Sequence, residues 1–301
     1  MTPQSKKPVI VRQVWADNLE FEISQIKRAI PDYPFVAMDT EFPGTIFEPY
    51  PNMTYLSHYY PYYSCNHHDY DPSFNYFLMK SNVDVLNIIQ LGLSLSDSEG
   101  NLPCFETEFS IVWEFNFRDF NIDCDPQNIE SIRLLERQGI DFKKNKEKGI
   151  NSWDFAKLVL CSGLVLNSSK LTWVTFHSSY DFGFLIKILT RHYLPCDIDS
   201  FMQLVVHYFG YKIYDIKHMI QFSRGLCGGL ERVAKLLHVE RKVGKSHQAG
   251  SDSLLTMQAF LRYTEWFSKE HKNDYKTRLV AFEGMLYGLE RKDSKRFLFI
   301  S

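Results

Sequence analysis

The stretch Phe35-Val-Ala-Met-Asp-Thr-Glu-Phe42 decides both the fold and the chemistry that this sequence suggests. It is a short apolar run after Pro34, as is typical of a buried central strand. Asp39 and Glu41 lie two residues apart within it, and because side chains alternate along a strand, both carboxylates point to the same face. Two neighbouring acids in an apolar strand either take up a proton or need a cation. The alternative is a strand end that reaches solvent.

Sequence patterns on both sides of this run predict the rest of a sheet. Before it, residues 11–29 have apolar residues at roughly helical spacing and predict a first helix, which Pro31 ends. After it, residues 87–97 and 109–117 each alternate along the chain as half-buried strands do. A turn signal at Glu99-Gly100 separates these two runs, so they predict a hairpin that extends the sheet.

The second half of the chain alternates predicted helices with a predicted strand. The spacing of apolar residues favours helices at 153–161, 182–189, 230–237 and from near Asp252 onward. Residues 171–176 predict a buried strand. The predicted strands come first in the chain, and predicted helices and strands then alternate. This order predicts one α/β domain in which a mixed sheet carries helices on both faces. We expect this domain over residues 11–270, followed by a C-terminal extension of uncertain structure over residues 271–301.

Two segments stand apart from this pattern. Residues 47–77 are rich in tyrosine and histidine, and their prolines exclude one long helix. The tyrosines fit either stacking on unpaired bases or a surface insertion packed on its own side chains. His67 and His68 near Cys65 lack a second pair at ligand spacing, which argues against a zinc site. The lysine-rich residues 142–149 predict an exposed, solvated loop.

The composition is that of a globular protein with a sizeable core. The chain has 301 residues, of which 45% are hydrophobic and 23% charged, so disorder is excluded. No run of about 18 apolar residues predicts a membrane span, and residues 1–15 lack the apolar core of a secretion signal. We therefore expect a location in the cytoplasm and nucleus, where cysteines without a Cys-x-x-Cys pair are reduced thiols. With 34 basic and 36 acidic residues the chain is not basic, yet this balance fits a nucleic-acid enzyme built on carboxylates and metal ions.

Three further residues indicate a catalytic or metal-binding site when they are considered together with Asp39 and Glu41. Asp181 starts a predicted helix, where an aspartate is either a helix N-cap or a ligand. The triplet Asp181-Phe-Gly183 occurs in protein kinases, but no Gly-rich phosphate loop or His-Arg-Asp accompanies it, which excludes a kinase. His247 lies five residues before Asp252, and a lone pair of this kind is often structural. Four acids and one histidine on these elements together favour a shared site.

The type of these side chains indicates which metal they would bind. Carboxylate oxygens are the ligands that Mg²⁺ and Mn²⁺ prefer, and two such ions about 3.5–4 Å apart hold the attacking water and the leaving oxygen of a phosphodiester. We expect Asp39 to bridge both ions and Asp181 to serve one of them. Glu41 and Asp252 would complete the other site. Histidine titrates near neutral pH, so we expect His247 to accept the proton of the attacking water.

These residues resemble the signature of a nuclease superfamily. Asp39-x-Glu41, Asp181, His247 and Asp252 match the DEDD 3′→5′ exonucleases in their histidine-bearing (DEDDh) branch. Four longer motifs resemble the CCR-associated-factor poly(A) ribonucleases, which are deadenylase subunits of the CCR–NOT complex: Met38-Asp-Thr-Glu-Phe-Pro-Gly44, Asn87-Ile-Ile-Gln-Leu-Gly-Leu93, Phe176-His-Ser-Ser-Tyr-Asp-Phe-Gly183 and His247-Gln-Ala-Gly-Ser-Asp-Ser253. The resemblance covers residues 11–263 and departs from the family at 50–74, where the family usually has a shorter loop.

The resemblance implies a ribonuclease H-like fold and metal-dependent removal of poly(A) tails from the 3′ end of messenger RNA, with release of AMP. It also implies two divalent cations, Mg²⁺ or Mn²⁺, and docking with the NOT scaffold and the CCR-type nuclease subunit. Arg241, Lys242 and Lys245 precede His247 and either hold RNA phosphates or form a solvated loop. Two other functions stay open: a single-stranded DNA or RNA exonuclease of the same superfamily, and a non-catalytic nuclease-like adaptor.

Overall fold

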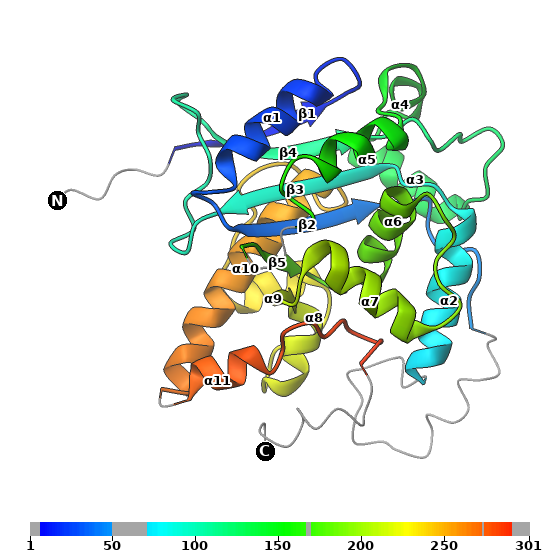
Figure 1. Ribbon diagram of the computed structural model, residues 1–301. Helices are drawn as coiled ribbons and strands as arrows, with labels where there is room; N and C mark the ends of the chain where they lie inside the picture. The colour runs from blue at the N-terminus through cyan, green and yellow to red at the C-terminus, as the bar shows by residue number, and fades with distance from the viewer. Residues whose placement is uncertain (1–6, 50–70, 167–169, 273, 291–301) are drawn as a thin grey trace.

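The computed structural model describes residues 7–49, 71–166, 170–272 and 274–290, whose strands form one mixed sheet (Figure 1). The strands are β1 (Val9–Val14), β2 (Phe35–Glu41), β3 (Gln90–Ser96), β4 (Ser110–Asn116), β5 (Thr172–Thr175) and β6 (Ile213–Asp215). Their order across the sheet is β1-β4-β3-β2-β5-β6. Strand β3 runs antiparallel to β2 and β4, whereas the other neighbours pair in parallel.

Helices cover both faces of this sheet. They are α1 (Leu19–Ala29), α2 (Pro72–Val85), α3 (Ile129–Gln138), α4 (Phe142–Lys148), α5 (Ser152–Leu160), α6 (Ser179–Thr190), α7 (Ile198–Phe209), α8 (Ile216–Met219), α9 (Leu230–Leu236), α10 (Ala249–Glu270) and α11 (Tyr275–Val280), with a short 3-10 helix at Ile220–Phe222. Apolar residues of α1, α5 and α6 form one core with Leu91 and Leu93 of the sheet. Those of α9 and α10 form a second core with Ala37 and Val174 on the opposite face (Figure 1). The predicted fold class, a mixed sheet in one α/β domain with helices on both faces, is confirmed.

Strand β3 shows how closely the centre of the sheet is packed from both sides. The alternation at 87–97 places leucines on one face and small or polar residues on the other, and every residue of β3 is buried. The leucines belong to the first core, whereas Ser94 shares a hydrogen bond of 2.9 Å with Ser253 of α10. A Cβ on Gly92 would lie 1.8 Å from the carbonyl oxygen of Ala249. Small residues therefore let the start of α10 lie directly on the sheet.

Two predicted elements are wrong. Residues 11–29 do not form one helix, because they contain most of β1 before α1 begins. The β-branched residues of β1 pair in parallel with β4, far along the chain, and local periodicity does not reveal such a contact. Residues 142–149 contain the helix α4 rather than a loop, since the carboxylate of Asp141 accepts the N–H of Lys144 at the start of that helix.

The other predicted elements are confirmed, with small shifts at their ends. The central strand, the hairpin of β3 and β4, the strand β5 and the helices α5, α6 and α9 lie where the sequence indicates. Helix α10 begins at Ala249, shortly before Asp252. Near the end of the described chain, α11 is followed by a segment in which Phe282, Leu286 and Leu289 are buried. This part of the predicted C-terminal extension therefore packs against the domain.

The tyrosine-rich insertion is described only in part. Pro72 opens α2, where its missing N–H costs nothing, and the rest of that helix packs against α6. Residues 50–70, with the predicted stacking tyrosines and with Cys65, His67 and His68, lie outside the described residues. Among the helices that the structure describes, none is long and apolar enough to cross a membrane.

We expect Gly92→Ala to lower the free energy of unfolding by at least about 2 kcal/mol, because the added methyl group meets the backbone of α10 and one of them must move. Urea unfolding followed by circular dichroism measures the change. Gly229→Ser is the matched control, since nothing lies within 4 Å of its Cβ position and serine suits the start of α9. An unfolding midpoint of Gly92→Ala equal to that of the native chain would contradict the close approach of α10.

Candidate active site

Strand β2 places two acids on the face of the sheet that α10 covers. Ala37 belongs to the core beneath α10, so Asp39 and Glu41, which follow at even spacing, point to the same side. Glu41 is buried, whereas Asp39 remains partly accessible. In the pairing of β2 with β3, Asp39 lies opposite Gly92, whose lack of a side chain lets the start of α10 lie close to the sheet at this point. The shared face that the spacing predicts is therefore present.

Helix α10 supplies a third acid. Asp252 lies in the first turn and is buried, in a position where the helix dipole favours negative charge. Its carboxylate accepts the main-chain N–H of His247 at 2.8 Å and pairs with the guanidinium of Arg241 at 2.5 Å. Glu114 of β4 holds the helix start on the sheet by accepting the N–H of Gly250 at 2.9 Å. These contacts fix Asp252 over the sheet.

Helix α6 supplies a fourth acid. Asp181 lies in its first turn, but the N-cap position belongs to Ser178, so the interpretation of Asp181 as a helix N-cap is wrong. Instead the Asp181 carboxylate accepts the hydroxyl of Thr40 at 2.6 Å. Thr40 is the residue between the two acids of β2, and it thus ties α6 to the strand that carries them.

The four carboxylates are close enough to repel one another. Burial raises the pKa of Asp39 well above its ordinary value, and the charges of Asp252 and Glu41 raise it further. Burial also raises the pKa of Glu41, with the charges of Asp252 and Asp181 adding to it. Burial raises the pKa of Asp181 to about 7 and that of Asp252 in the same direction, although Arg241 opposes the shift at Asp252. Acids arranged in this way are stabilised by protons or by cations.

His247 approaches the same cluster from the loop before α10. Its side chain is exposed, and one of its ring nitrogens lies within 4.8 Å of a carboxylate oxygen from each of Glu41 and Asp252. The backbone φ of His247 is 59°, a left-handed conformation that the N–H bond to Asp252 helps to hold. The structure thus brings together Asp39, Glu41, Asp181, His247 and Asp252. Oxygen ligands with one imidazole at their edge fit Mg²⁺ or Mn²⁺.

The predicted RNA-contacting residues differ in their surroundings. The side chain of Arg241 is only 14% exposed, and it pairs with Glu231 of α9 as well as with Asp252. Arg241 is therefore an internal partner of the carboxylates, which the sequence does not reveal because its two partners lie on different helices. Lys242 and Lys245 are exposed, and their contact with RNA stays a prediction.

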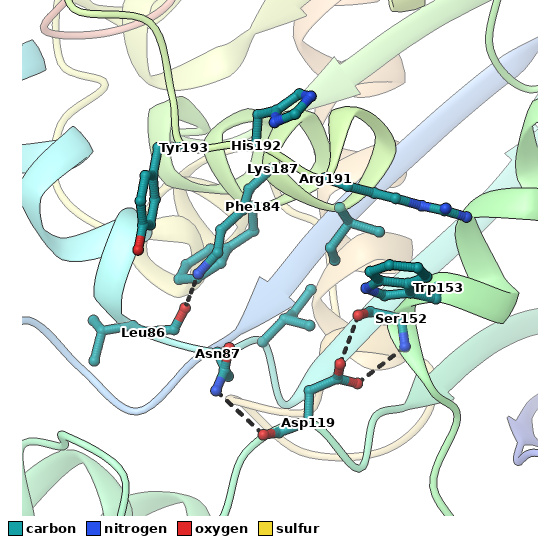
Figure 2. A pocket seen from close by; sticks show the side chains of 12 residues that line it. Leu86, Asn87, Asp119, Ser152, Trp153, Phe184, Lys187, Arg191, His192 and Tyr193 are labelled. Carbon is teal, nitrogen blue, oxygen red and sulfur yellow. Dashed lines mark hydrogen bonds between the residues drawn. The ribbon is translucent and has the colours of Figure 1, made fainter.

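A cavity of about 360 Å³ lies between the end of α6 and the start of α5 (Figure 2). Trp153 and Tyr193 stand on opposite sides of it, and the guanidinium of Arg191 lies 4.1 Å from the Trp153 ring. Asp119 accepts both the N–H and the hydroxyl of Ser152 at its edge. The lining includes none of the five clustered residues, so this cavity is separate from the candidate active site.

Comparisons of the sequence with known proteins identify its family. The profile described as CAF1 family ribonuclease matches residues 14–156. A protein of Arabidopsis thaliana named probable CCR4-associated factor 1 homolog 7 is 44% identical over 280 residues, which are 93% of this chain and 93% of the relative. The poly(A) ribonuclease pop2 of Schizosaccharomyces pombe is 40% identical over 279 residues, which are 93% of this chain and 75% of the relative.

Solved structures are similar over the same length. The structure of S. pombe Pop2p in its Mg²⁺- and Mn²⁺-bound form has a TM-score of 0.77 and 40% identity, and the match covers 93% of this chain and 99% of that chain. The structure of the yeast NOT1 MIF4G domain co-crystallised with CAF1 matches with a TM-score of 0.70 and 30% identity, over 92% of this chain and 96% of that chain. The similarity therefore extends across the whole domain, including the elements that carry the acids.

The raised pKa values predict how the stability of the metal-free protein depends on pH. The unfolded chain releases these protons near about pH 4, whereas the folded chain keeps them to higher pH, so the free energy of unfolding falls as the pH rises from about 4 through about 7. We expect Asp39→Asn to raise the thermal midpoint of EDTA-treated protein at about pH 8, because it removes one repelling charge. The same variant should lose the stabilisation that Mn²⁺ gives to the native chain.

Glu130→Gln provides the control for this experiment, since Glu130 is exposed on α3 and forms its ion pair with the exposed Arg133. Its thermal midpoint should follow that of the native chain with and without Mn²⁺. A lower midpoint for Asp39→Asn in EDTA, together with an undiminished gain from Mn²⁺, would show that these acids do not form one cation site.

Proposed function

Because this chain belongs to the CAF1 family of ribonucleases, we propose that it is a metal-dependent 3′→5′ exoribonuclease that shortens poly(A) tails of messenger RNA and releases AMP. The observation that carries the proposal is the meeting of four acids from β2, α6 and α10 beside the exposed His247. The name of the S. pombe relative, poly(A) ribonuclease, supports the substrate. The Mg²⁺- and Mn²⁺-bound form of Pop2p supports the choice of cations.

The four acids would hold two divalent cations, Mg²⁺ or Mn²⁺. When bound, such cations supply positive charge to the scissile phosphodiester and make a water molecule more acidic. The chain itself keeps the acids in place for this purpose. Thr40 holds the carboxylate of Asp181, and the main-chain N–H of His247 holds that of Asp252. A rigid set of ligands of this kind leaves little to reorganise when substrate arrives.

His247 is the residue that we propose as general base. Its ring lies beside Glu41 and Asp252, so a ring nitrogen can accept the proton of the attacking water at that edge of the cluster. Because the side chain is exposed, the proton can then pass to solvent. Lys242 and Lys245 are exposed in the loop before His247, and we propose that their ammonium groups contact phosphates of the RNA.

The partners of this chain follow from the same relatives. A CAF1 chain co-crystallises with the NOT1 MIF4G domain, and the A. thaliana relative is named for its association with CCR4. We therefore propose that this chain docks onto a NOT scaffold together with a CCR-type nuclease. Its location in the cytoplasm and nucleus stays a prediction.

Two other functions make different predictions. A single-stranded DNA exonuclease would degrade DNA and RNA of equal sequence alike, because it would not use the 2′-hydroxyl. A non-catalytic adaptor would need no tight dication site, and the buried acids around Asp39 argue against it, since they are costly without a cation.

Incubation with RNAs that end in A, C or U tails tests the proposed function directly. We expect ladders that shorten from the 3′ end of the A-tailed RNA, with AMP as product and no reaction in EDTA. Asp252→Ala should slow AMP release by about 10³-fold or more, because several kcal/mol of transition-state stabilisation depend on the cations that it holds. Asp154→Ala is the matched control, since Asp154 also lies in the first turn of a helix but is exposed.

The outcomes of this assay are distinct. Equal degradation of all tails and of DNA would favour the DNA exonuclease. Undiminished AMP release by Asp252→Ala would overturn the proposed site. A folded chain that binds Mn²⁺ weakly and cuts no tail would favour the adaptor.

His247→Ala should slow AMP release by about 10²–10⁴-fold, the usual contribution of a general base. The matched control is His238→Ala, because His238 is also exposed and has a left-handed backbone with φ of 58°. Single-turnover rates between about pH 6 and pH 8 measure the effect. If His247→Ala cuts at the native rate across this range, the general base is another group.

A further inference from the structure

Asp215, at the end of β6, is a fully buried carboxylate that the proposed reaction does not use. One of its oxygens accepts the main-chain N–H of His177 at 2.8 Å and of Lys217 at 3.0 Å. The other accepts the main-chain N–H of Ser178 at 3.1 Å and of Tyr287 at 3.0 Å. A carboxylate that accepts this many N–H bonds is held in one position, and it in turn fixes the positions of the residues that donate to it.

Two of these donors form the turn that leads into α6. His177 has a φ of 61°, a left-handed conformation that is unfavourable for a residue with a side chain. Ser178 occupies the N-cap position of α6, but its side chain makes no capping bond. Its hydroxyl accepts from Thr175 at 2.7 Å and donates to Asp215 at 3.4 Å. Asp215 therefore holds the unfavourable turn just before the first residue of α6.

This turn sets where Asp181 stands. Asp181 follows Ser178 within the first turn of α6, so a change in the turn rotates or shifts its carboxylate. The carboxylate must stay within reach of Thr40, whose hydroxyl lies 2.6 Å away. Burial is the main cause of the raised pKa of Asp181, and the charge of Asp215 adds to it.

The fourth donor comes from the end of the described chain. Before it, the N–H of Gly284 donates to the carbonyl of Ile213 at 2.9 Å, which aligns this segment with β6. The ring of Tyr287 packs edge-on against the ring of His177, with 4.9 Å between their centroids. The ammonium of Lys217 lies 5.4 Å from the centre of the Tyr287 ring. The segment after α11 thus packs against the turn.

We propose that Asp215 is a positioning residue for the proposed nuclease reaction: it fixes the turn at His177 and Ser178, and through it the carboxylate of Asp181, with the help of the Tyr287 N–H. The proposal rests on the proposed function for its effect on rate, but not for its effect on cation binding. If the Asp215 carboxylate only supported the fold, its substitution would lower the stability of the protein and leave cation binding unchanged. Substitution of a positioning residue also weakens the binding of a divalent cation by the acid cluster.

Asp215→Asn tests the proposal in the full chain, because an amide group keeps the size of the side chain but offers one acceptor atom in place of two. Calorimetric titration with Mn²⁺ should show about 10- to 100-fold weaker binding, as is usual when a group that orients a metal ligand is lost. In the tail-shortening assay kcat should fall by a similar factor, with KM for A-tailed RNA changed less than about 3-fold.

Asp197→Asn is the matched control, since Asp197 caps α7 by accepting the N–H of Ser200 at 2.8 Å, on a helix that supplies no acid to the cluster. It should lower the thermal midpoint and leave Mn²⁺ binding at the native value. A folded Asp215→Asn variant with native Mn²⁺ affinity and native kcat would overturn the proposal.

A second pair of variants answers the question if Asp215→Asn does not fold. Tyr287→Pro removes one N–H donor to Asp215, whereas Tyr287→Ala keeps it and removes only the ring. We expect Tyr287→Pro to weaken Mn²⁺ binding more than about 3-fold beyond Tyr287→Ala. Equal affinities of the two variants would overturn the proposal.

Separate measurements test the nuclease function and the role of Asp215: RNA shortening tests the first, and Mn²⁺ binding tests the second. A native chain that binds Mn²⁺ but shortens no RNA would contradict the proposed function, while the calorimetric comparison would still decide the role of Asp215. A native chain that binds no Mn²⁺ would overturn both.

Discussion

The rest of this structure depends on one electrostatic constraint: four carboxylates repel one another in a place with little water. Burial and the neighbouring charges raise the pKa of Asp39 and Glu41 far above the ordinary values. In the metal-free protein this arrangement costs free energy, and only protons or cations relieve it. The scaffold must therefore be rigid enough to hold the acids against their own repulsion. The hydrogen bonds of Thr40 to Asp181, of the His247 N–H to Asp252 and of the Gly250 N–H to Glu114 serve that requirement.

Strand β2 meets the requirement by using both of its faces. Asp39 and Glu41 point toward α10, which brings Asp252, whereas Thr40 between them donates its hydroxyl to Asp181 of α6. Acids from both sides of the sheet thus meet at one strand. The acids can come together at β2 because the helices that carry them lie close to the sheet and begin at fixed positions over it. Gly92 allows the close approach of α10, Glu114 holds the start of α10 by accepting the N–H of Gly250, and Asp215 holds the turn before α6 by accepting the N–H of Ser178.

Local properties of the sequence predict the acids and the elements that carry them. The spacing of Asp39 and Glu41 in an apolar run gives a shared strand face, and Asp252 marks the start of a helix, because both patterns depend only on near neighbours. Contacts between distant segments are not visible in this way. The pairing of β1 with β4 is one case, and the hydrogen bond of Thr40 to Asp181 is another. The lysine pattern in α4 indicates exposure but does not distinguish a loop from an exposed helix.

The central claim is that these acids gather in order to hold divalent cations. The most direct measurement is the anomalous scattering of crystals grown with Mn²⁺, which locates each ion independently of activity. We predict anomalous peaks among the carboxylates contributed by β2, α6 and α10, with Asp39 in contact with both ions. Peaks that lie only at other acids of the chain, or no peak at saturating Mn²⁺, would contradict the account.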